Sequence, residues 1–141
     1  MACALYSIKK EYSTLILSGV KSIEFRKYPA SKQLDKLYIY ESRGLGKIVG
    51  EVFVEKTVTC PLEYAWKLGA KRGCISKQYF ESYYSGKSSA TLIYLGECSS
   101  YETPISLKEI GVSRPPQSFC YLTDLQCSYL SSQPQRPVCK A

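Results

Sequence analysis

Four charged side chains near the start of the sequence have the types and spacing best suited to chemistry. Lys21, Glu24, Arg26 and Lys27 place three cations around one carboxylate. At ~3.3 Å per residue, Glu24 and Arg26 would lie about 7 Å apart on one strand face, with Lys21 in the turn before it. Such a set suits binding of a phosphate or of a base edge with both donors and acceptors. The spacing also fits an ordinary solvated strand face with a Glu–Arg pair.

Aromatic side chains add a second element of this hypothesis. Tyr28 directly follows the basic residues and is the best candidate for stacking on an unpaired base. Trp66 and the Tyr79, Phe80, Tyr83 pattern fit helix packing better than base stacking. A second basic cluster predicts either an extension of a phosphate-binding surface or a solvated loop. It comprises Lys67, Lys71, Arg72 and Lys77.

The charge balance favours an anionic partner. The chain has 19 Lys and Arg against 12 Asp and Glu, a net charge of +7. Residues 1–48 hold nine of the basic and four of the acidic groups. This uneven distribution is typical of a surface that binds phosphate backbones, although a basic protein with no such partner would show the same total.

The sulfur and imidazole content excludes several classes of site. Seven cysteines, an odd number without any C-x-x-C pair, predict reduced thiols and a cytoplasmic location. Histidine is absent, which excludes Ser-His and Cys-His catalysis and every His-containing zinc site. We therefore expect no cofactor and no metal. No apolar run approaches the roughly 18 residues of a membrane span, so we also expect no membrane partner.

Hydrophobic periodicity predicts short strands interrupted by helices. One helix, over residues 12–19, follows the first strand, and two more form a mid-chain insertion at 61–69 and 76–86. This order predicts an α+β fold built on a small mixed β-barrel. The predicted strands cover residues 5–8, 22–26, 37–41, 47–58, 90–98 and 118–122, with a brief helix at 107–110.

The end of the chain has a different composition. Residues 123–141 are rich in Ser, Gln and Pro, with few large apolar groups. Such composition predicts a mostly disordered tail. We therefore expect one domain over residues 1–122.

Several dispersed motifs resemble those of an ASCH domain, over about residues 4–122. They are residues 5–9, the Gly19-x-Lys21-x-x-Glu24-x-Arg26 pattern, residues 48–51 and residues 114–119. The resemblance implies a PUA-like β-barrel whose cleft, between the first helix and the barrel, binds RNA or a nucleotide. It also implies the cleft residues, which are Lys21, Glu24 and Arg26, with Ser7, Lys9, Gln117 and Ser118 beside them.

Two branches of this family imply an enzyme instead. Bacterial acetylcytidine amidohydrolases use a Lys and a Thr in a G-x-K-T-x-T-x-R stretch, together with a distant Glu. Here Lys21 and Arg26 match, but Ser22 and Glu24 stand where the Thr residues would be, so the catalytic hydroxyl is missing. Other members are ribonucleases that rely on Lys, Tyr and Ser, and those residues cannot be assigned in this chain.

Three hypotheses follow for function. The first is an RNA- or nucleotide-binding module in RNA metabolism or in regulation of transcription or translation. The second is a metal-independent hydrolase, a ribonuclease or modified-nucleoside amidohydrolase, with Lys21 as its base. The third is an interaction protein with no nucleic-acid role. The oligomeric state is left open.

Overall fold

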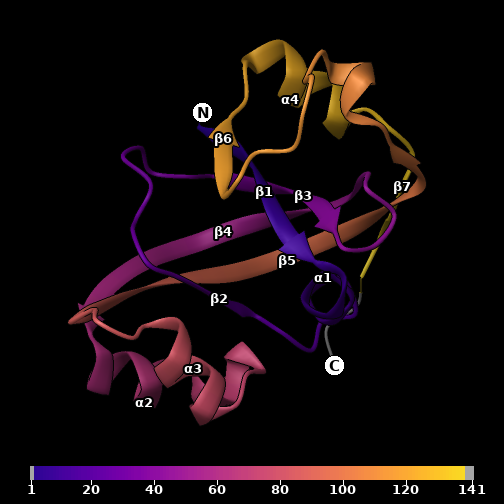
Figure 1. The fold of residues 1–141 in the computed structure, drawn as a ribbon. Helices are drawn as coiled ribbons and strands as arrows, with labels where there is room; N and C mark the ends of the chain where they lie inside the picture. Colours follow the sequence, from indigo (N-terminus) through magenta and orange to yellow (C-terminus); the bar gives the residue numbers. More distant parts are fainter. Residues whose placement is uncertain (1, 139–141) are drawn as a thin grey trace.

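The structure, a computed structural model, describes residues 2–138 and contains strands and helices in the order shown in Figure 1. Most of the ranges agree with the periodicity of the sequence. The strands are β1 (Cys3–Lys9), β2 (Ile23–Arg26), β3 (Lys36–Ser42), β4 (Ile48–Pro61), β5 (Ser89–Ile105), β6 (Phe119–Tyr121) and β7 (Gln135–Pro137). The helices are α1 (Lys10–Leu17), α2 (Leu62–Gly73), α3 (Lys77–Tyr83), α4 (Asp124–Ser131) and the 3-10 helix η1 (Leu107–Ile110).

Within the described residues, the strands form a single mixed sheet. Its order is β2-β5-β4-β3-β1-β6, and β7 also pairs with β5. β1 and β3 run parallel, whereas the other neighbours are antiparallel. Register shifts between β4 and β5, at residues 48–56, bend these long strands because each bulge increases the local twist. The sheet curls into a half-barrel, which confirms the predicted α+β fold.

α1 packs against the sheet, whereas α2 and α3 lie together at one end of the β4–β5 pair. Figure 1 shows α2 and α3 at the end where β4 finishes and β5 begins, and α4 and β6 at the top of the view, away from α2 and α3. α2 and α3 are the predicted mid-chain insertion. None of the helices within residues 2–138 is long and apolar enough to cross a bilayer.

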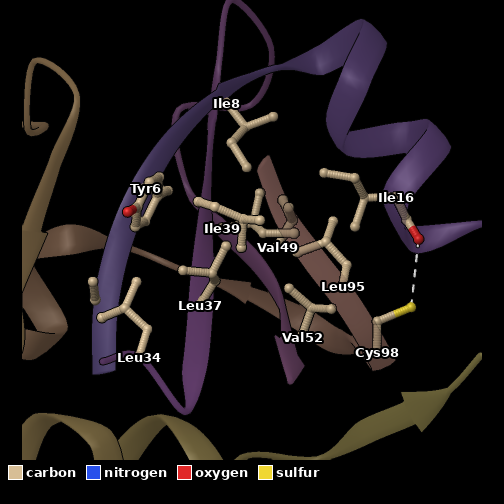
Figure 2. Close-up of a cluster of buried hydrophobic side chains, with 12 residues drawn as sticks. Tyr6, Ile8, Ile16, Leu34, Leu37, Ile39, Val49, Val52, Leu95 and Cys98 are labelled. Carbon is tan, nitrogen blue, oxygen red and sulfur yellow. Dashed lines mark hydrogen bonds between the residues drawn. The ribbon is translucent and has the colours of Figure 1, made fainter. Parts of the chain in front are cut away.

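The main core lies between the curled sheet and α1 (Figure 2). Tyr6 and Ile8 of β1 point into it, together with Ile16 of α1. The Cys98 thiol of β5 donates a hydrogen bond to the Ile16 carbonyl oxygen at 3.4 Å. Leu5 alternates to the other face of β1 and is buried in a second core. β1 is therefore buried on both faces, which fixes its position in the sheet.

The prediction of a disordered tail is wrong for residues 124–137, which form α4 and β7. A capping box starts α4, because the Thr123 hydroxyl accepts from the Gln126 amide and the Gln126 side chain accepts from the Thr123 amide. Leu130 is fully buried in the second core. β7 adds to β5 at residues 99–101. A segment with few apolar residues can still fold here, because Leu130 packs into a core that other elements build. Residues 139–141 lie outside the described residues.

Candidate functional site

Residues of β1, α1, β2 and α3, together with the turn before β2 and the loop before α3, line a pocket of about 270 Å³. It lies where β1 ends and α1 begins, beside β2 and α3. Three cations and one carboxylate line it together with aromatic rings and two aliphatic side chains. The lining residues are Ser7, Ile8, Lys9, Tyr12, Lys21, Glu24, Phe25, Arg26, Ile75, Tyr79 and Tyr83.

A tight turn places Lys21 in this pocket. Gly19 has φ of 82°, a left-handed conformation that favours glycine and ends α1. The amide groups of Val20 and Lys21 then both donate to the Leu15 carbonyl oxygen at 3.0 Å. The reversal turns the Lys21 side chain inward, where it is 2% exposed. This lysine is thus a buried cation rather than part of a solvated strand face.

The end of α2 supplies the main partner of Lys21. Its Nζ donates to the carbonyl oxygen of Gly73, the last residue of α2, where the helix dipole favours a cation. α2 and β2 approach closely because Gly69 and Gly73 of α2 both face the Phe25 ring of β2. A Cβ at these positions would lie 2.4 and 2.3 Å from ring atoms. The sequence predicts a helix ending at Gly69, but α2 continues to Gly73 and thereby brings its carbonyl to the site.

Glu24 lies between the two cations. Its Oε1 is 3.6 Å from Lys21 Nζ, and its Oε2 accepts from Arg26 Nε at 3.1 Å and Nη2 at 2.8 Å. Arg26 Nη2 also donates to the Ser7 carbonyl oxygen at 3.1 Å, and Nη1 donates to Ser118 Oγ at 3.3 Å. The guanidinium carbon lies 4.9 Å from the Tyr6 ring centre. Contacts from β1, from the end of α2 and from the segment before β6 therefore hold these charges in fixed positions.

Tyrosines form the opposite wall, and sequence reasoning missed them. Lys21 Nζ lies 5.3 Å from the Tyr12 ring centre, and Tyr12 meets Tyr79 at 6.0 Å between centres. Tyr79 and Tyr83 stack nearly parallel at 6.2 Å. Burial raises the pKa of Tyr12, so its hydroxyl stays protonated. The available signal is the i, i+4 spacing of Tyr79 and Tyr83, which places the two rings on one side of a helix.

The remaining predicted site residues lie at or beyond the rim. Lys9 is exposed and lines the pocket. Lys27 is outside the lining, with its Nζ 4.9 Å from the Tyr83 ring centre. Tyr28 is 64% exposed and accepts from Lys87 Nζ at 2.6 Å. Gln117 and Ser118 are both exposed and lie outside the pocket lining, although Ser118 Oγ accepts a hydrogen bond from Arg26.

Burial lowers the pKa of Lys21 below its ordinary value of 10.5, only partly offset by Glu24. We expect the Lys21 ε-carbon resonance to titrate below 10.5 in ¹³C NMR, and lower still in Glu24→Gln. Unfolding takes up a proton between the folded and unfolded pKa values, so this residue makes stability rise with pH across that window. The contribution is complete above the unfolded pKa and is lost as pH falls through the folded one. A midpoint at or above 10.5 would contradict this account.

The arrangement can bind a small anion beside an aromatic surface. Lys21 and Arg26 offer positive charge that Glu24 only partly balances, and the tyrosine rings offer flat apolar faces. Phosphate groups and bases need these two kinds of partner. Among residues 2–138, no group of three or more carboxylate or thiol side chains is placed to hold a metal ion.

Comparison with known proteins identifies the family. The sequence profile of the ASCH domain matches residues 7–106, and the chain belongs to this family. It is 29% identical over 124 residues to an ASCH domain-containing ribonuclease of Zymomonas mobilis, covering 84% of this chain and 83% of that protein. A crystal structure of ASCH from Zymomonas mobilis superposes with a TM-score of 0.85 at 28% identity, covering 92% of this chain and 94% of that one.

Two more distant similarities are informative about fold and extent. The large ribosomal subunit protein uL22 of Ureaplasma parvum is 26% identical over 102 residues, covering 72% of this chain but 33% of that protein. The N-terminal domain of McrB from Staphylothermus marinus has a TM-score of 0.56 at 15% identity, with 92% and 93% coverage, which shows a shared fold.

Proposed function

We propose that this protein binds single-stranded RNA, with a phosphate and its base held in the pocket around Lys21 and Arg26. The observation that carries the proposal is the buried Lys21–Glu24–Arg26 charge set facing the Tyr12, Tyr79 and Tyr83 wall. Arg26 offers a planar group suited to phosphate oxygens, and a base can stack on tyrosine. Support also comes from the relatives, since one is a ribonuclease and another a ribosomal subunit protein.

The test is fluorescence anisotropy of labelled single-stranded RNA across a salt series. With two or three phosphate contacts, log affinity should fall against log salt with a slope of about −1.4 to −2. The variant Lys21→Met/Glu24→Gln/Arg26→Met should lose at least tenfold in affinity while staying folded, because replacing a complete buried ionic set by neutral side chains of similar size is tolerated.

A matched control removes another buried ion pair. Lys36 Nζ contacts Glu51 Oε2, with side chains 13% and 6% exposed, beside the start of β1 rather than its pocket end. Lys36→Met/Glu51→Gln should bind RNA as the wild type does. Binding that is independent of salt, or equal in the triple variant and the wild type, would overturn the proposal.

A second candidate function is RNA hydrolysis, which the lowered pKa of Lys21 favours. A lysine that releases its proton more readily can act as a base, and Tyr12, Ser7 and Ser118 lie around the same charges. RNA recovered from the binding assay and run on a gel separates the two candidates. Cleavage by the wild type that Lys21→Met abolishes would support an enzyme, whereas intact RNA supports a binding module.

A further inference from the structure

A second cavity, of about 510 Å³, lies between α2 and α3 on the other side of α3 from the first pocket. Its volume is typical of ligand sites. Trp66 of α2 and Phe80 of α3 form its aromatic part, with ring centres 5.2 Å apart. Three lysines against two glutamates give its rim a positive balance; the lysines are Lys67, Lys77 and Lys87.

Charged and aromatic residues join this cavity to the first pocket around the end of α3. The Tyr84 hydroxyl donates to the Arg26 carbonyl oxygen at 2.7 Å, which fixes the chain leaving β2 against the helix. Lys27 then lies over the Tyr83 ring, and Lys87 Nζ donates to the Tyr28 hydroxyl at 2.6 Å. Since Lys87 also lines the second cavity, cations and aromatic rings alternate from one pocket to the other.

We infer that the second cavity is a base-binding subsite for the same RNA strand, reached over Lys27, Tyr28 and Lys87. The inference rests on the proposed function and deepens it, because it extends the contacts from the one nucleotide in the first pocket to several nucleotides of the same strand. Alternating cations and aromatic faces are the pattern that holds single strands: the cations contact phosphates and the rings stack on bases. A base entering the cavity would lie beside Trp66, with Lys77 and Lys87 at its rim.

A length series tests the subsite. We would compare labelled single-stranded RNAs, a trinucleotide and a strand of about ten nucleotides, within the site sizes of single-strand-binding domains. The longer strand should bind about tenfold more tightly. Tyr28→Ala/Lys87→Ala should remove roughly that tenfold and leave the trinucleotide affinity within about twofold, given what one stacked base contributes.

Trp66 fluorescence can report binding in the second cavity, and a pair of residues far from it provides a control. Trp66 is the single tryptophan, so the longer strand should quench tryptophan emission and the trinucleotide should not. Lys108→Ala/Tyr129→Ala removes one exposed lysine and one tyrosine, 40% exposed, at η1 and α4, and should change neither affinity.

Failure of the subsite and failure of the first pocket give different results. If both RNAs bind equally, or if Trp66 emission is unchanged and Tyr28→Ala/Lys87→Ala binds the longer strand normally, the subsite is overturned while the first pocket stands. Tighter binding of double-stranded RNA than of the single strand would overturn it as well. If the wild type binds neither RNA, the proposed function fails and the subsite fails with it.

Discussion

Replacing Glu24 by alanine should lower the free energy of unfolding by about 3 kcal/mol, the usual effect of breaking a buried ion pair. The side chains of Glu24 and Lys21 are 10% and 2% exposed, and Arg26 is 14% exposed. Without the carboxylate, two largely buried cations would face each other with no opposite charge between them. Urea unfolding followed by circular dichroism measures the change.

Two further variants show whether burial is the cause. Glu102 pairs with Arg136 at 3.9 Å, with side chains 49% and 78% exposed, so Glu102→Ala should cost less than about 1 kcal/mol. In a Lys21→Met/Arg26→Met background, Glu24→Ala should have a much smaller effect, because no buried cation is left unpaired. Equal losses at Glu24 and Glu102 would contradict the buried-charge account.

Leu130→Ala should destabilise the protein by roughly 2 to 5 kcal/mol, as large-to-small changes in a packed core do. Leu130 is fully buried and packs with Leu5 of β1 and Ile110 of η1. The size of this effect measures how far α4 belongs to the folded domain. Thermal and urea unfolding of the same variant give the value.

The same helix contains the control. Leu125 is 84% exposed, so Leu125→Ala removes an equal number of atoms from α4 without opening a core. It should change the free energy of unfolding by less than about 0.5 kcal/mol. Similar, small effects at Leu125 and Leu130 would mean that α4 is not packed on the barrel in solution.

Sequence reasoning succeeded where a local pattern determines the structure. Alternation predicts β2, the helix signals predict α1 and the mid-chain helices, and the dispersed motifs led to the ASCH family. The tail shows the limit. Its composition is that of a disordered segment, but Leu130 anchors it by packing into a core that distant strands build. The composition of the tail carries no information about that core.

In the site, too, local sequence patterns predict some residues, and others come from distant parts of the chain. Lys21, Glu24 and Arg26 were found because they are neighbours along one strand and its preceding turn. The Gly73 carbonyl and the Tyr79 and Tyr83 rings belong to the insertion, which follows the charged set only after β3 and β4 in the chain. Only the close packing of α2 on Phe25, which two glycines permit, brings them to the pocket. Tyr28 lies outside the lining of the first pocket, because its hydroxyl accepts from Lys87, a residue that lines the second cavity.

The position of β1 in the sheet affects how the protein is made. β1 pairs on one side with β3 and on the other with β6, whose residues 119–121 are synthesised long after residues 4–6. Until β6 leaves the ribosome, the emerging chain has an unpaired edge on a strand rich in apolar side chains. Aggregation during synthesis should therefore depend on how soon that edge is covered, and slower translation before residue 119 should lower the soluble yield.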